Sequence, residues 1–365
     1  MRVHVLLGNA FCFRYLKRTF GVLVALCALL VLLVIFAYNT RFAGHGPGPV
    51  PRGSPPKSQI SCYFENRRRN SLRELDPAEV TENSIFFIET SCAHDDGIRL
   101  NLRQACAVES AASLNPNSKI FVLFVSGGFA NNDSAIITAL NAYGNIHLRH
   151  VDFTKYSYGT PAHGFVTSDA IFTSDWPVPH SSDLLRFLTL WKFGGTYLDL
   201  DMVLMKSLEG IKNFACAQSS SFIASSVLNF GTDDVGKMIA NITVHDFVEN
   251  YRGYEWAYNG PGVITRALQK VCNTDSIDIM DKVMCKGFTV YKPEAFCPIS
   301  WNEWFLYFDE NESENTMAKL KGSMGIHTWN YLSKYTDVIV GSKQPYGLVA
   351  VDYCSNIFAL AESVF

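Results

Sequence analysis

The stretch that decides the fold reads SSDLLRFLTLWKFGGTYLDLDMVLMKSL and covers residues 181–208. Apolar residues at helical spacing in its first half predict a helix over 182–193. Gly194 and Gly195 follow this helix and end it. The apolar run after them predicts a strand over 196–205. A helix that leads directly into a buried strand is typical of α/β proteins.

The same alternation of strands and helices begins about 100 residues earlier. Short apolar runs predict strands at 85–89, 120–125 and 146–151, and helical patterns fill 98–114 and 132–143. Strands separated by helices of this length predict a mostly parallel sheet with crossover helices, in which ligands bind at the carboxyl ends of the strands. After residue 215 the sequence is less regular and richer in aromatics, and we expect it to pack on the same sheet as the other wall of a cleft.

The amino-terminal part predicts a membrane anchor. Residues 20–38 form a run of 19 residues without a charge or a proline. A helix of this length is long enough to cross the hydrocarbon core of a bilayer. Four of the 31 basic residues and none of the 34 acidic ones precede this span, so the positive-inside rule places residues 1–19 in the cytosol. Residues 39–83 include the Pro/Gly-rich run GHGPGPVPRGSPP, which predicts a luminal stem.

Cysteines and sequons agree with a luminal catalytic part. Eight of the ten cysteines follow the span, an even number in an oxidising compartment, but their pairing is open. Sequons predict N-glycosylation at Asn132, Asn241 and Asn311. The mildly acidic luminal part gives no support for nucleic-acid binding. Self-association is left open.

The chemistry is concentrated in Asp199-Leu200-Asp201, at the end of the apolar run. Alternate residues of a strand point to one face, so a continuous strand would bring both carboxylates together. Two converging carboxylates repel each other unless a cation lies between them, and oxygen ligands suit Mn²⁺ or Mg²⁺. Such an ion would stabilise a departing diphosphate. Phosphohydrolases of the HAD type carry a similar motif, but theirs opens the catalytic domain, whereas about 115 residues of α/β pattern precede this one.

Several segments in order resemble one enzyme family. Residues 181–208, FIETSC at 87–92, RQACAVESAA at 103–112, YEWAYNGPGVITRAL at 254–268 and GIHTWN at 325–330 are similar to the α1,4-glycosyltransferases related to globotriaosylceramide synthase. The resemblance implies a GT-A-type domain over 84–345, with the DxD region at 84–215 and the family's C-terminal region at 216–345, followed by a tail at 346–365. It also implies a single-pass type II protein of the Golgi membrane.

The resemblance further implies the residues of a UDP-sugar site. Asp199 and Asp201 would hold Mn²⁺, with His327 as a third ligand. The remaining donor-binding candidates are Asp183, Arg186, Gly194, Gly195, Tyr197 and Trp329, and the acceptor-binding candidates are Trp256, Tyr258, Asn259, Gly260 and Pro261. Sequence alone leaves most of these residues open to a purely structural role.

The family's reaction retains the α configuration. Such a reaction uses either a nucleophile behind the sugar or a front-face path in which the leaving phosphate helps to deprotonate the acceptor. Asp246 is a candidate nucleophile, and Asn229 is a candidate residue near the reacting carbon. The activity that the resemblance implies is Mn²⁺-dependent transfer of galactose from UDP-galactose to a lactosylceramide-like glycolipid in α1,4 linkage. The alternatives are transfer of N-acetylgalactosamine or N-acetylglucosamine to another glycolipid or glycoprotein, and an inactive glycan-binding protein.

Overall fold

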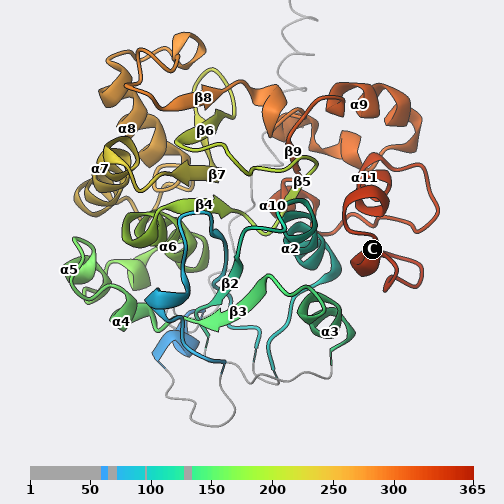
Figure 1. The fold of residues 1–365 in the computed structure, drawn as a ribbon, viewed down its shortest axis with the longest axis horizontal. Helices are drawn as coiled ribbons and strands as arrows, with labels where there is room; N and C mark the ends of the chain where they lie inside the picture. Colours follow the sequence, from blue (N-terminus) through green and yellow to red (C-terminus); the bar gives the residue numbers. More distant parts are fainter. Residues whose placement is uncertain (1–58, 65–71, 95–96, 127–133) are drawn as a thin grey trace, which may run out of the picture. The chain divides into compact units, whose positions relative to one another are not determined.

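The computed structural model describes residues 59–64, 72–94, 97–126 and 134–365 (Figure 1). The predicted anchor at 20–38, most of the predicted stem and the sequon at Asn132 lie outside these residues. Within the described ranges no helix combines the length and apolar character needed to cross a membrane.

A seven-stranded sheet forms the centre of the domain and confirms the predicted α/β class. Its order is β3-β2-β1-β4-β7-β6-β8, and four of its six pairings are parallel. The strands are β1 (Ile85–Glu89), β2 (Ile120–Phe124), β3 (Ile146–His150), β4 (Gly195–Leu198), β6 (Phe214–Ala217), β7 (Ile223–Phe230) and β8 (Thr289–Tyr291). A separate two-stranded sheet joins β5 (Met202–Leu204) to β9 (Gly325–His327).

Helices cover both faces of the large sheet because its strands are apolar on both sides. In β1, Phe87 packs toward the core that contains α2 (Leu102–Leu114), while Phe86 packs toward the core that contains α6 (Pro177–Phe193). Figure 1 shows α6, α7 (Asp234–Asn250) and α8 (Pro261–Cys272) together on one side of the sheet. The remaining helices are α3 (Ala135–Asn141), α4 (Phe153–Tyr156), α5 (His163–Val166), α9 (Ser313–Leu320), α10 (Asn330–Ser333), α11 (Pro345–Tyr353) and α12 (Ser355–Phe358).

The strand order changes direction at β1, so the parallel strands β1 and β4 form the switch point of the sheet. The chain leaves β1 on one side to form β2 and β3, and it returns on the other side of β1 as β4. Helices that lead away from neighbouring parallel strands in opposite directions leave a gap at those ends, which is where open α/β sheets bind ligands. Asp199 directly follows β4 and therefore lies at this point.

The predicted continuous strand over 196–205 is wrong. The strand breaks at the DxD motif: β4 ends at Leu198, Met202 N–H donates to the Asp199 carbonyl at 2.9 Å, and β5 begins in the second sheet. The motif is thus the turn that passes the chain from one sheet to the other. Its two carboxylates converge through this turn and not through strand periodicity.

The structure requires glycine at positions 194 and 195 for a reason that the sequence did not show. Both adopt positive φ, +67° and +86°. A Cβ on Gly195 would lie 2.5 Å from the Ser84 carbonyl oxygen, and one on Gly194 would lie 2.9 Å from that of Phe230. The space around both residues is therefore filled by backbone, which gives no support to the prediction that they admit a ligand.

Two predicted peripheral segments belong to the packed domain. Ile60, Cys62 and Tyr63 lie in the predicted stem but are buried in the α6-side core. The predicted tail forms α11 and α12, and its Tyr346 and Phe365 are buried in the opposite core. Residues 60–63 and the carboxyl-terminal helices therefore pack with the domain.

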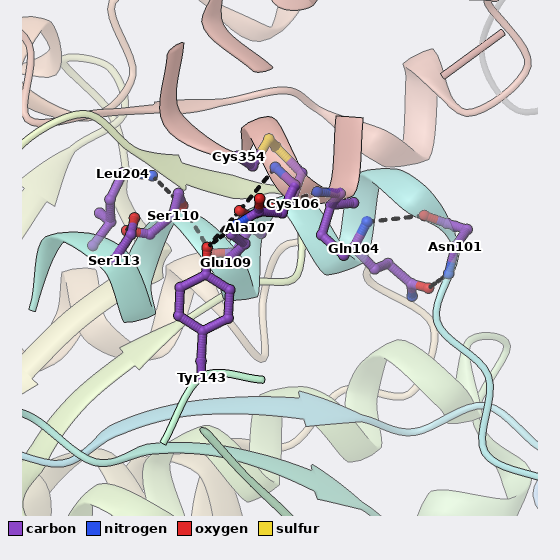
Figure 2. The surroundings of a disulfide bond; sticks show 12 residues. Asn101, Gln104, Cys106, Ala107, Glu109, Ser110, Ser113, Tyr143, Leu204 and Cys354 are labelled. Atoms are coloured by element: carbon purple, nitrogen blue, oxygen red, sulfur yellow. Dashed lines mark hydrogen bonds between the residues drawn. A yellow bond between two sulfur atoms is a disulfide. The ribbon is translucent and has the colours of Figure 1, made fainter. Parts of the chain in front are cut away.

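The described residues form three disulfides, Cys62–Cys92, Cys106–Cys354 and Cys272–Cys285. Cys216 and Cys297 are buried and unpaired, so six of the eight cysteines expected to be luminal form disulfides. Figure 2 shows the second disulfide joining α2 to the carboxyl-terminal region. Beside it the buried carboxylate of Glu109 accepts hydrogen bonds from the backbone of Asn356 and Ile357 and from the Tyr143 hydroxyl, at 2.6–3.1 Å.

The disulfides predict unequal contributions to stability. Cys106–Cys354 joins residues 248 apart, whereas Cys272–Cys285 joins residues 13 apart. Closing a longer loop removes more entropy from the unfolded chain, about 5 kcal/mol against about 3 kcal/mol. Denaturant titration under non-reducing conditions should therefore show a larger loss of unfolding free energy for C106A/C354A than for C272A/C285A. A larger loss of unfolding free energy for C272A/C285A would contradict the view that the disulfides stabilise the protein mainly through loop entropy.

Candidate metal and nucleotide-sugar site

The pairing of β5 with β9 brings His327 to the DxD motif. In its register Met202 lies opposite His327, so the histidine is adjacent to Asp201 although 126 residues separate them in sequence. Thr328 N–H donates to the Asp201 carbonyl at 3.0 Å and extends this contact past the end of β9. The backbone pairing of two short strands therefore fixes the position of the imidazole relative to the carboxylates.

Three ligand atoms converge, one from each of Asp199, Asp201 and His327, and all lie within 4.8 Å of one another. His327 Nε2 is 3.2 Å from Asp201 Oδ1 and 3.9 Å from Asp199 Oδ2. The second oxygen of Asp201 accepts a hydrogen bond from Asn330 N–H at 2.7 Å. Two carboxylate oxygens and one imidazole nitrogen therefore face a common point. The second oxygen of each aspartate is hydrogen-bonded to other protein groups.

Tyr197 and Arg186 hold the other oxygen of Asp199. The Tyr197 hydroxyl donates to Asp199 Oδ1 at 2.6 Å, and Arg186 Nη1 donates to the same oxygen at 3.0 Å. The guanidinium also lies over the Tyr197 ring, with its carbon 4.7 Å from the centroid, and donates to the Ser225 carbonyl at 3.0 Å. Both side chains are buried, so they fix one oxygen of Asp199 and leave Oδ2 free.

Asp183 completes this charged group. It lies one turn before Arg186 on α6, and its Oδ1 is 3.0 Å from Arg186 Nη2. Both residues are buried, so this ion pair lies inside the protein and not on its surface. Burial raises the pKa of Asp183 to about 6, although Arg186 acts in the opposite direction.

The donor set fits a hard divalent cation. Asp183, Asp199 and Asp201 can supply three negative charges, whereas Arg186 supplies one positive charge. Burial lowers the pKa of His327, but the carboxylates of Asp201 and Asp199 together outweigh it and raise this pKa above its usual value, which favours a proton on the imidazole. A cation at the common point would replace that proton, and oxygen with imidazole nitrogen suits Mn²⁺. The buried Nδ1 of His327 has no hydrogen-bond partner among the residues that the structure describes, so neither a carboxylate nor a carbonyl there fixes it as a donor.

Trp329 has an unusual backbone conformation beside this site. Its φ is +54°, which is rare for a bulky residue and often marks a functional site. The indole ring packs on His327 with centroids 4.2 Å apart, and its Nε1 donates to the Ile299 carbonyl at 2.9 Å. This conformation also orients Asn330 N–H toward Asp201. The observed role of Trp329 is thus to shape the loop and support the histidine.

The predicted acceptor residues divide into two groups. Trp256 is partly exposed, whereas Tyr258 lies between the guanidinium groups of Arg252 and Arg266, at 3.9 and 4.0 Å from its ring centroid. The faces of Tyr258 are thus already occupied by protein groups. The structure places these two aromatics in different surroundings.

Asn259, Gly260 and Pro261 form a tight connection to α8. Pro261 is the first residue of the helix, as the sequence predicts for a helix start. A Cβ on Gly260 would lie 2.4 Å from Asp183 Oδ1, so glycine is needed for this close approach. Asn259 is buried and uses its amide to hydrogen-bond the backbone of Arg252. The loop therefore borders Asp183.

Asp246 and Asn229 lie outside the cluster. Asp246, on α7, forms an ion pair with Arg266 of α8 and accepts from its Nε at 3.0 Å. Asn229 lies opposite Thr196 at the start of β4, the other end of the strand from Asp199. Its amide accepts from Asn213 N–H and donates to the Thr196 hydroxyl, both at 2.8 Å. Each side chain has protein partners that give it a structural role.

Sequence reasoning missed two members of the site, Ser225 and Asn330. Ser225 supports Arg186 through its carbonyl and hydroxyl, and Asn330 acts through its backbone N–H alone. A backbone donor leaves no signal in residue type, and Ser225 precedes Ser226 in a run of small residues. Only the GIHTWN segment, which contains Asn330, pointed to this region.

Comparison with known proteins identifies the family. Residues 232–361 match the model described as the alpha 1,4-glycosyltransferase conserved region, and residues 102–220 match the glycosyltransferase sugar-binding region containing the DXD motif. The lactosylceramide 4-alpha-galactosyltransferase of Mus musculus is 31% identical over 76% of this chain and 76% of its own length. The alpha-1,4-N-acetylglucosaminyltransferase of Homo sapiens is 26% identical over 75% of this chain and 79% of its own.

The chain therefore belongs to the α1,4-glycosyltransferase family and is a glycosyltransferase. This assignment removes the phosphohydrolase alternative, whose motif the DxD resembles. Among solved structures, the galactosyltransferase LgtC in complex with donor and acceptor sugar analogues aligns with a TM-score of 0.38 and 13% identity, covering 76% of this chain and 96% of its own.

The hydrogen bond from Tyr197 to Asp199 predicts that Tyr197 orients a ligand of the cation site. Tyr197→Phe removes a hydrogen bond to Asp199 but no cation ligand, so the Mn²⁺ concentration for half-maximal activity should rise about ten-fold, as for other groups that orient metal ligands. Tyr156→Phe is a matched control, because its buried hydroxyl bonds Thr189 at 3.0 Å and no carboxylate. An equal Mn²⁺ requirement for both variants would contradict this role of Tyr197.

Proposed function

We propose that this protein is a retaining hexosyltransferase that moves galactose from UDP-galactose to a lactosylceramide-like glycolipid in α1,4 linkage. The observation that carries the proposal is the convergence of Asp199 Oδ2, Asp201 Oδ1 and His327 Nε2 at the carboxyl end of β4. The transferred sugar and the acceptor are those in the name of the Mus musculus lactosylceramide 4-alpha-galactosyltransferase. The reaction belongs to glycosphingolipid synthesis.

Each side chain has a distinct task in this proposal. Asp199, Asp201 and His327 would hold Mn²⁺, with Mg²⁺ as a substitute. When bound, the ion neutralises the charge that develops on the diphosphate leaving group. Tyr197 and Arg186 orient Asp199, and Trp329 supports His327. These residues are fixed by buried contacts before the substrate binds, which lowers the cost of assembling the site.

Asp183 is the group best placed to recognise the donor sugar. It is buried beside Arg186, and Gly260 brings the loop before α8 against its carboxylate. A buried carboxylate is a strong hydrogen-bond acceptor for sugar hydroxyls. The side chains of Asp246 and Asn229 already have protein partners and are left out of the proposed site.

The three disulfides support an oxidising compartment. Together with the apolar run at 20–38, they favour a type II protein whose catalytic domain faces the Golgi lumen. Asn241 and Asn311 are exposed and could carry N-glycans there.

A second candidate is transfer of N-acetylglucosamine. The human alpha-1,4-N-acetylglucosaminyltransferase is 26% identical over a similar share of this chain, so the fold and the site are compatible with either donor. A purified protein assayed with Mn²⁺ and each UDP-sugar in turn, with mass-spectrometric analysis of the linkage formed, separates the two. Turnover of UDP-N-acetylglucosamine but not UDP-galactose would replace the first proposal by the second.

The proposed cation site predicts loss of transfer in three variants. Asp199→Asn, Asp201→Asn and His327→Leu each remove a ligand, and we expect UDP-galactose turnover to fall at least 100-fold. Asp246→Asn is the control, since it alters a carboxylate outside the cluster and should keep turnover within about three-fold. Full turnover in Asp199→Asn would exclude the proposed site, and complete loss in Asp246→Asn would restore that residue as a candidate nucleophile.

A further inference from the structure

Four exposed side chains, Trp256, Tyr331, Leu332 and Tyr335, form a surface beside the cation site. We call it the aromatic surface. The rings of Trp256 and Tyr331 lie 4.4 Å apart between centroids. Lys334 Nζ lies over the rings of both Tyr331 and Tyr335, at 5.9 and 5.0 Å from their centroids, and so connects them. Tyr335 is 88% exposed, which is unusual for a large side chain.

The aromatic surface is continuous with the cation site. Asn330, whose N–H bonds Asp201 Oδ2, directly precedes Tyr331 and begins α10. Thr328, two residues before α10, donates its N–H to the carbonyl of Asp201, the residue before β5, at 3.0 Å. Any molecule or membrane that covers the aromatic surface therefore lies beside the ligands of the proposed cation.

The backbone under the aromatic surface is firmly held. Ser333 is buried, and its hydroxyl donates to the Thr328 carbonyl at 2.8 Å. The Arg103 guanidinium donates to the carbonyls of Ser333 and Thr336. The neighbouring side chains of Leu332 and Tyr335 are exposed on this fixed support. Their exposure is thus a property of an ordered segment that is hydrogen-bonded to the core.

The composition of the segment matches a lipid interface. Residues 329–336 read WNYLSKYT, with two tyrosines, a leucine and a lysine but no acidic residue. Tyrosine and tryptophan are enriched where proteins meet lipid headgroups, and a lysine there can reach the phosphates. This combination of aromatic rings with a single lysine suits contact with lipid headgroups and needs no net charge on the leaflet.

We propose that the aromatic surface docks on a lipid bilayer and presents the cation site to glycolipid headgroups in that bilayer. This inference rests on the proposed function, in which the acceptor is a glycolipid and the enzyme is anchored to a membrane. Docking would hold a headgroup sugar next to Asp201 without requiring the lipid to leave its leaflet. It assigns Leu332 and Tyr335 to lipid contact, outside the catalytic machinery.

The first test measures contact directly and does not depend on activity. Full-length protein is placed in nanodiscs of phosphatidylcholine and phosphatidylserine, or in amphipol without a bilayer, and side-chain oxidation by hydroxyl radicals is compared. Oxidation of Tyr335 should fall several-fold in nanodiscs. Tyr158, an exposed tyrosine that follows α4, should be oxidised equally in both. Equal oxidation of Tyr335 in both would overturn the proposal.

The second test separates lipid contact from sugar contact. The L332S/Y335S variant should transfer galactose to lactosylceramide in vesicles about ten-fold more slowly than the wild type. Its rate with a water-soluble lactoside should stay within about two-fold, because neither residue contacts the cation site. Tyr158→Ser is the control and should retain both rates.

The outcomes also distinguish this inference from the proposed function. An equal loss with both acceptors would overturn lipid docking and indicate a surface that stacks on sugar. An unchanged rate on vesicles would overturn it too. If the wild-type protein transfers galactose to neither acceptor, the proposed function fails, whereas the protection of Tyr335 in nanodiscs still decides whether the surface contacts lipid.

Discussion

The site depends on the register of one short antiparallel pairing, β5 with β9. Only three residue pairs define it, and they place His327 opposite Met202, one residue from Asp201. A shift by one residue would turn the imidazole to the other face of the strand. Gly325 restricts such a shift. A Cβ at its position would lie 2.9 Å from the Val203 carbonyl oxygen, so a shift that put any other residue there would create a clash. The meeting of nitrogen and oxygen ligands is thus fixed by backbone packing at the end of the strand.

The electrostatics follow from that placement. Three carboxylates, one guanidinium and one histidine occupy a small, largely buried region. Buried charges are stable only when they are paired, and here Arg186 is shared by two of the carboxylates while His327 faces the third. The group retains an excess of negative charge until a cation enters. The same imbalance that disfavours the empty arrangement therefore favours binding of a divalent cation.

The sequence predicts the framework well because its signals are local. Buried strands such as 85–89 and the helix that ends at Gly194 are marked by periodicity and by breakers. The break in the strand at 199–201 carries no such mark, because the change of partner from β7 to β9 is a tertiary event. Spacing likewise shows nothing of the Cys106–Cys354 disulfide or of Asn330, which acts through its backbone. His327 was found only through resemblance, since no rule of spacing joins residues 126 apart.

The proposed function depends on a single cation site formed by His327 and the two aspartates. Pulsed electron paramagnetic resonance of the Mn²⁺-loaded protein tests it directly, because a coordinated imidazole gives a ¹⁴N coupling. The account predicts this coupling in the wild type and its loss in His327→Gln, with the ion still bound more weakly through the aspartates. A bound Mn²⁺ without nitrogen coupling in the wild type, or a coupling that persists in His327→Gln, would contradict it.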